Sequence, residues 1–114
     1  MTINDVEVKI DFTDADTLER IEIGSKKTHE EVEKLKNDIK EIPLAEGIRQ
    51  ECKILKDFLD YVLGEGTSEK VFGKKDSLQE CVKAFEDIIN ERDKQYNTFI
   101  NKISKYSPER ANRQ

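Results

Sequence analysis

The fold of this 114-residue chain depends most on residues 77–106, which read SLQECVKAFEDIINERDKQYNTFINKISKY. Ser77 and Glu80 have the spacing of a capping box, in which each side chain binds the backbone N–H of the other residue at a helix start. Apolar side chains then recur every three or four residues, with Arg92 as the one charged intruder. The series is Leu78, Val82, Phe85, Ile89, Tyr96, Phe99, Ile103 and Tyr106. This spacing predicts a long amphipathic helix over 77–106, stopped by Pro108.

A second long helix is predicted over 14–42, with Thr13 as its N-cap. Two positions, three residues apart, repeat every seven residues, as in a helix packed along one stripe. The first position holds Leu18, Ser25, Val32 and Ile39, and the second holds Ile21, Thr28, Leu35 and Ile42. Small residues in the middle and a second capping box at 28–31 make a break near Gly24 the alternative. We favour one continuous helix.

Proline and glycine divide the segment between these two helices. The residues that do so are Pro43, Gly64, Gly66 and Gly73. They predict a helix over 44–63 and a short helix over 67–72, the latter capped by Thr67 or Ser68. The longer of the two has a wide apolar face made by Ile48, Cys52, Leu55, Phe58, Leu59 and Val62.

Residues 2–12 are predicted to be β structure. Apolar residues alternate strictly with charged ones from Val6 to Phe12, which is the period of a half-buried strand. Asn4 and Asp5 can turn a short hairpin whose first arm is Thr2 and Ile3.

The predicted fold class is therefore mainly α: an N-terminal β-hairpin or strand, then a helical bundle of three helices of which the first and last are long. Residues 1–108 are expected to form a single domain, and residues 109–114 a flexible tail. The apolar seams of the long helices outrun the surface that can cover them within one chain. This excess predicts a homo-oligomer.

Composition narrows the classes of function. Hydrophobic residues make up 35% of the chain and charged residues 39%, and the net charge is −5. An acidic chain without a basic face argues against nucleic-acid binding. No apolar run approaches the ~20 residues of a membrane span, and the N-terminus lacks the features of a signal peptide. We therefore expect a cytoplasmic protein that binds no membrane and no nucleic acid.

The motifs of catalysis and of cofactor or metal binding are not met. The acidic run from Asp11 to Glu19 does not fit a calcium loop, which requires a glycine at its sixth position and a glutamate at its twelfth. Counted from Asp14, these positions hold Glu19 and Ser25. His29, the single histidine, lies among glutamates on a predicted helix. The segment 66–75 has the wrong glycine spacing for a phosphate-binding loop. We expect no enzyme activity, no catalytic residue, no cofactor and no metal.

Cys52 and Cys81 are the only cysteines, and each lies among apolar residues of a predicted helix. The prediction is two buried free thiols in a reducing compartment. A disulfide or a metal pair is the alternative.

Two stretches carry a resemblance to a known family. Residues 11–20 (DFTDADTLER) join the predicted strand to the first helix, and residues 58–73 (FLDYVLGEGTSEKVFG) join the second helix to the short one. In this order they resemble small tail-region proteins of phages and prophages of Gram-positive bacteria, similar to siphophage tail assembly chaperones. Residues 78–89 are similar to the final amphipathic helix of that family. The likeness covers nearly the whole chain, although the charged part after Asn90 is less typical.

The resemblance implies a non-enzymatic assembly factor in the cytoplasm of a bacterial host cell. Its expected partners are tape-measure and tail-tube proteins, and a longer form made by frameshifting is expected for this class. The residues we expect to shape or bind a partner around the central loop are Phe58, Tyr61, Gly64, Gly66, Phe72, Gly73 and Phe85. The alternative is a coiled-coil adaptor or structural interaction protein of another bacterial system.

Overall fold

The structure, a computed structural model, describes residues 1–106 except for the side chain of Ile39. Its elements are β1 (Thr2–Ile3), β2 (Val6–Glu7), α1 (Ala15–Asp38), the 3-10 helix η1 (Ile39–Glu41), α2 (Leu44–Leu63), α3 (Thr67–Phe72) and α4 (Leu78–Ser104). The mainly α class with an N-terminal strand pair is confirmed. The predicted tail at 109–114 lies outside the described residues.

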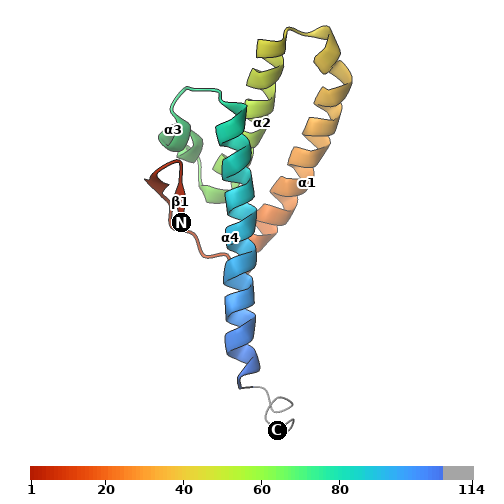
Figure 1. Cartoon of the computed structure of the whole chain (residues 1–114). Coiled ribbons are helices and arrows are strands. Elements are labelled where there is room, and N and C mark those ends of the chain that lie inside the picture. Colours follow the sequence, from red (N-terminus) through yellow and green to blue (C-terminus); the bar gives the residue numbers. More distant parts are fainter. Residues whose placement is uncertain (107–114) are drawn as a thin grey trace.

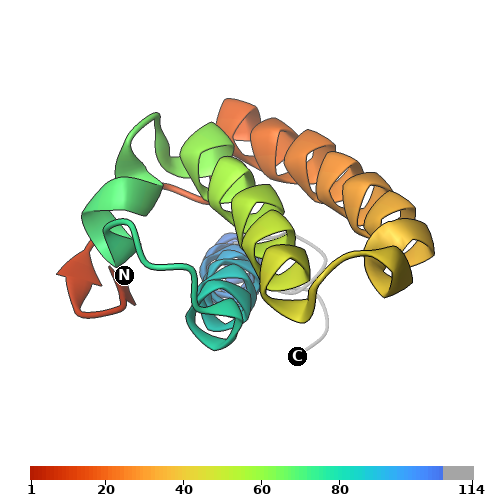
Figure 2. The same ribbon diagram turned by 90° about the horizontal axis from the view of Figure 1, so that it is seen from above.

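The helix α2 lies at the centre of the fold and contacts α1, α3 and α4. α1 and α2 run side by side in opposite directions, and α4 packs on the far side of α2 from α1 (Figures 1 and 2). The strand pair and α3 flank the bundle on one side (Figure 2). The largest side chains that are fully enclosed are Phe12, Ile3, Ile21, Leu59, Ile88, Cys52 and Cys81. They belong to one continuous core to which the N-terminal segment and all three long helices contribute.

The predicted strand over 2–12 is too long. β1 and β2 pair antiparallel with Ile3 opposite Val6, and the strand ends at Glu7. Asn4 and Asp5 turn the hairpin with φ angles of 49° and 65°, which these two residue types tolerate better than most. The alternation of residues 8–12 is nevertheless real, because Val8, Ile10 and Phe12 face the core and the residues between them are exposed. Val8 still exchanges backbone hydrogen bonds with Met1, at 2.8 Å each, but from Lys9 onward the segment packs on the core without a neighbouring strand.

The first long helix is unbroken at Gly24, as favoured, but both of its ends differ from the prediction. The N-cap is Asp14 and not Thr13, because an Asp14 carboxylate oxygen accepts the Thr17 backbone N–H at 3.1 Å. The α-helical part ends at Asp38, and η1 follows in place of the predicted last turn. Ile42 is extended, with φ −118° and ψ 155°, as expected for the residue before a proline.

The face of α4 that is buried in the core differs from the apolar stripe that the sequence predicts. The serine cap is confirmed, since the Ser77 hydroxyl accepts the Glu80 N–H at 3.4 Å. The residues of α4 that are buried are Cys81, Ala84 and Ile88, whereas Val82 is 39% exposed. Cys81 lies against Cys52 of α2, and Ala84 lies beside the hairpin. The predicted end at residue 106 is also late, since α4 ends at Ser104.

Candidate protein-binding site

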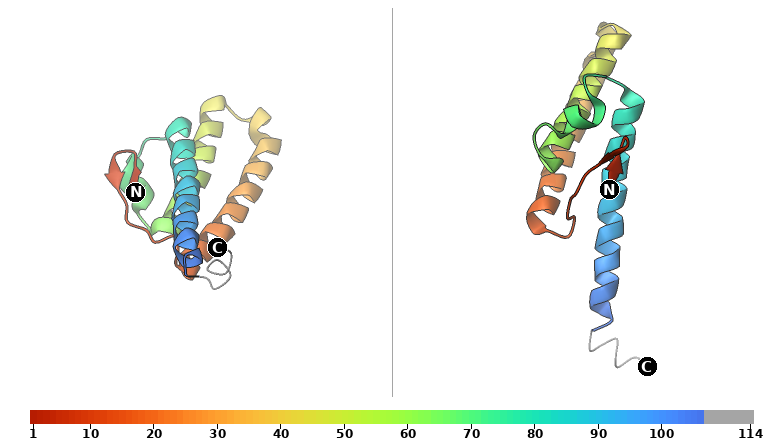
Figure 3. Two further views of the ribbon diagram at one scale, coloured as in Figure 1. Left: turned by 60° about the horizontal axis from the view of Figure 1, so that its bottom comes forward. Right: turned by 90° about the vertical axis from the view of Figure 1, so that its left-hand side faces the viewer.

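The far end of α4 has little cover beyond Gln95, whose side-chain oxygen accepts the Phe12 backbone N–H at 2.9 Å. We call residues 94–106 the arm; it runs beyond the ends of the other helices (Figures 1 and 3). Its large apolar side chains recur at the spacing of one helix face. They are Tyr96 at 51% exposure, Phe99 at 49%, Ile100 at 43%, Ile103 at 58% and Tyr106 at 87%. A run of large apolar side chains this exposed marks an interaction surface.

The arm differs in charge from the rest of the chain. It holds three lysines, Lys94, Lys102 and Lys105, and no acidic residue. Residues 1–93 hold 24 of the 25 acidic residues and 15 of the 20 basic residues. The chain is therefore acidic over residues 1–93 and basic along the arm.

A second apolar surface lies between α1 and α2. A hollow of about 270 Å³ is lined there by residues of both helices. We call it the groove; its lining is Ile23, Gly24, Lys27, Thr28, Glu31, Ile54, Asp57, Phe58 and Tyr61. Ile23 is 50% exposed and Tyr61 is 46% exposed. A Cβ atom on Gly24 would lie 3.0 Å from Cδ2 of Tyr61, so a glycine is what lets the two helices approach here.

The structure separates the aromatic residues predicted to shape or bind a partner. Phe58 and Phe72 lie in the core, and Phe85 is partly buried against it. The rings of Phe58 and Phe85 pack with centroids 4.7 Å apart. Tyr61 is the exposed member and lies in the groove. A docking role for these residues stays a prediction, and Tyr61 is the one whose position suits it.

The three glycines predicted to shape the central loop have positive φ angles. The values are 115° at Gly64, 90° at Gly66 and 64° at Gly73. Gly64 ends α2, Gly66 precedes α3 and Gly73 ends α3. Such conformations cost a residue with a side chain of order 1–3 kcal/mol. The backbone of this loop therefore depends on residues without a Cβ atom.

The start of α3 is capped by a side chain of α2, which the sequence did not predict. Thr67 and Ser68 were the predicted caps, but the N-cap position is Gly66, which has no side chain. The Asp60 carboxylate accepts the Ser68 backbone N–H at 2.7 Å and the Ser68 hydroxyl at 3.0 Å. This contact spans eight residues and two helices, so no local capping pattern reveals it.

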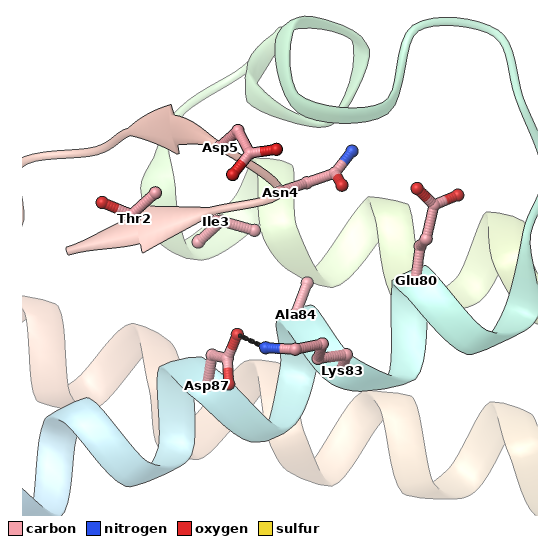
Figure 4. Close-up of a pocket in the computed structure, with 8 residues that line it drawn as sticks. All are labelled: Thr2, Ile3, Asn4, Asp5, Glu80, Lys83, Ala84 and Asp87. Atoms are coloured by element: carbon pink, nitrogen blue, oxygen red, sulfur yellow. Dashed lines mark hydrogen bonds and ion pairs between the residues drawn. The ribbon is translucent and has the colours of Figure 1, made fainter.

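A crevice between the hairpin and α4 has a volume of about 340 Å³, and Figure 4 shows the residues around it. Three of its charged side chains form ion pairs: Lys83 pairs with Asp87 at 2.9 Å, and Glu80 with Lys75 at 3.3 Å. The Asn4 side-chain amide donates to the Val71 carbonyl at 2.9 Å. The Asn4 contact attaches the hairpin to α3, and the Glu80–Lys75 pair attaches the loop after α3 to α4. They do not place a nucleophile beside a base.

Three further points concern the single histidine, metal ligands and membrane spans. His29 is exposed on α1. Within residues 1–106 the His, Cys, Asp and Glu side chains form no cluster of three that could hold a metal ion. The same part of the chain has no helix both long and apolar enough to span a membrane.

The two cysteines face each other between α2 and α4, and both thiols are free and buried. Burial raises the pKa of Cys52 and raises that of Cys81 to about 12, the latter helped by the neighbouring thiol. The thiolate is the reactive form, so a raised pKa protects both residues.

We expect iodoacetamide to leave both cysteines unmodified in the native protein at mildly alkaline pH and to alkylate both once urea unfolds the chain. Mass spectrometry of the quenched reaction measures this. Since the folded pKa of these thiols lies above the unfolded value of about 8.5, the folded state holds more protons, and stability should fall as pH rises above about 8.5. Rapid native alkylation of Cys81 would contradict the buried geometry.

The chain matches the model of a family of unknown function (DUF6673) over residues 4–114, and it belongs to that family. No curated protein and no solved structure matches it.

Proposed function

We propose that this member of DUF6673 is a non-enzymatic binding protein that holds another protein on the arm, in the role of a phage tail assembly chaperone. The observation that carries the proposal is the exposed apolar face of the arm from Tyr96 to Tyr106. The resemblance of residues 11–20 and 58–73 to tail assembly chaperones supplies the role. The proposed clients are tape-measure and tail-tube proteins.

The shape of the arm suits a helical client. Tyr96, Phe99 and Ile103 follow one another at spacings of three and four residues, which is how an amphipathic helix meets another helix. Fully burying one large apolar side chain contributes about 1.5–3 kcal/mol. Several such side chains on one face can offset the cost of association, while a contact of only a few helical turns stays reversible. Reversible binding is what an assembly factor needs.

The same spacing supports a second candidate, a coiled-coil adaptor of another bacterial system. Residues 96, 99, 103 and 106 continue a heptad seam. An adaptor differs from a chaperone because it forms a stable complex of fixed stoichiometry. The identity and the stoichiometry of the captured protein therefore separate the two candidates.

The experiment is an affinity pull-down of the tagged chain from cells that carry its native gene cluster, read by mass spectrometry. The arm variant is Phe99→Asp with Ile103→Asp. The matched control is Asn97→Asp with Asn101→Asp, which adds the same charge at exposed positions on the other side of the helix. We expect the wild type and the control to recover a tape-measure or tail-tube protein, and the arm variant to recover at least about 30-fold less, which corresponds to a loss of about 2 kcal/mol.

Two results would count against the proposal. Recovery of unrelated proteins at fixed stoichiometry would replace the chaperone by the adaptor. Equal recovery by the arm variant and the control would show that the client binds elsewhere.

A further inference from the structure

We propose that the arm of one copy docks in the groove of a second copy, so that copies of this chain join head to tail. The occupant of the groove is thus a second copy of the same protein. This contact goes beyond the proposed function, because it needs no client, although it uses the same arm.

The arm and the groove have matching lengths and complementary character. The groove runs along two turns of α1, from Ile23 to Glu31, and two turns of α2, from Ile54 to Tyr61. Tyr96 to Ile103 on the arm also span two turns, or about 10 Å. Both surfaces leave large apolar side chains about half exposed. A helix laid between α1 and α2 would bury both at once.

The arm cannot reach the groove of its own chain. α4 is one unbroken helix from Leu78 to Ser104, and its first half packs against α2. The arm is therefore carried straight past the ends of the other helices (Figure 3). Only another copy can bring an arm to the groove.

Charge favours this pairing over the pairing of two arms. Two arms laid together could form no ion pair with each other, because the arm has three lysines and no acidic residue. An arm in the groove instead meets the acidic body, and the charged residues that line the groove are two carboxylates, Glu31 and Asp57, and one lysine, Lys27. These carboxylates contact only exposed lysines, Lys27 at 4.0 Å and Lys53 at 2.9 Å. Exposed ion pairs of this kind are weak, so a lysine of the arm can replace such a partner.

The contact joins two different surfaces, and this has a consequence for assembly. Each copy that offers an arm still has a free groove, so a further copy can add to it. Such head-to-tail contacts form rings if the geometry closes and open chains if it does not. We expect assemblies that grow with concentration and shrink as salt screens the charges.

The test uses two variants of the full chain in sedimentation velocity. The arm variant, Phe99→Asp with Ile103→Asp, keeps its groove. The groove variant, Ile23→Lys with Tyr61→Lys, keeps its arm and repels an incoming lysine. Gln79→Lys with Asn90→Lys is the matched control, because it adds the same charge at exposed positions of α4 outside both surfaces. Circular dichroism and thermal unfolding check that each variant is folded.

We expect the wild type and the control to assemble, each variant alone to remain monomeric, and the two variants mixed to form dimers that grow no further. A mixture that stays monomeric, or a wild type that is monomeric at every concentration, would overturn the proposal. A groove variant that dimerises alone would show that arms pair with arms. If the groove is not folded correctly in the double variant, Ile23→Lys alone replaces it in the same mixture.

The two proposals fail in different experiments. The groove variant keeps its arm, so in the pull-down it should still capture a client whether or not copies associate. Loss of self-association with client capture intact would reject the head-to-tail contact only. Loss of client capture by the wild type would reject the proposed function only.

Discussion

Replacing Phe58 by alanine is expected to lower the free energy of unfolding by about 3–5 kcal/mol. Phe58 is 3% exposed on α2, and its ring packs on Phe85 of α4. Its Cδ1 also lies 3.4 Å from the position of a Cβ atom on Gly24, which places it against α1. The side chain therefore joins all three long helices, and its removal leaves a cavity that no single helix can fill. Domains of this kind have about 5–15 kcal/mol of stability in total, so the loss is large.

Urea denaturation followed by circular dichroism measures this loss. Tyr61→Ala is the matched control, since it removes an aromatic side chain from the same helix one turn later, at a position 46% exposed. We expect the control to lose less than half as much stability as Phe58→Ala. Equal losses in the two variants would mean that the ring of Phe58 is not a core residue, and the packing of α2 between α1 and α4 would have to be revised.

The double substitution Gly64→Val with Gly66→Val is expected to cost about 2–6 kcal/mol and to displace α3. Both glycines have positive φ, 115° and 90°, where a β-branched residue is strained by roughly 1–3 kcal/mol each. Relief of the strain would rotate the loop between α2 and α3. The contact of Asp60 with the Ser68 N–H, at 2.7 Å, would then be lost and α3 would lose its cap.

Chemical denaturation and hydrogen exchange of residues 67–72 measure the two parts of this prediction. Gly66→Asn is the control, because its φ of 90° and ψ of −8° lie in the left-handed region, which asparagine tolerates better than valine. We expect the control to keep most of its stability and the protection of α3. If the valine variant folds and protects α3 as the wild type does, the backbone-shaping role of these glycines is wrong.

Under the two proposals, the arm has two binding partners. A client helix and the groove of a second copy would compete for Tyr96, Phe99 and Ile103. Free chains would then keep their apolar arms covered until a client arrives. Adding a captured client to the assembled wild type should therefore release smaller species.

Local sequence features determined the boundaries of α2 and α3 and the start of α4. Pro43, Gly64, Gly66 and Gly73 act on the backbone of their own neighbours, and α2 and α3 span the same residues as the ranges 44–63 and 67–72. The cap at Ser77 is also local, since it acts three residues along the chain. Such signals can be recognised without a fold because both partners lie in one short stretch.

Tertiary structure decided which neighbour each apolar side chain meets. The alternation of residues 8–12 indicates side chains that point in opposite directions, but not whether a strand or a helix covers them. Periodicity likewise placed the core stripe of α4 on Val82, which is 39% exposed, whereas the buried residues of α4 are Cys81, Ala84 and Ile88. The cap that Asp60 supplies to α3 depends on how α3 packs against α2.

The candidate site shows the same division. The sequence by itself predicted an apolar seam along the whole of residues 77–106 and more seam than one chain can cover. It did not show where the cover ends, because Phe85 and Tyr96 belong to the same repeat. Only the tertiary structure makes Phe85 part of the packed bundle and leaves Tyr96 half exposed. The physical reason is that burial depends on where the neighbouring helices stop, and α4 continues past them.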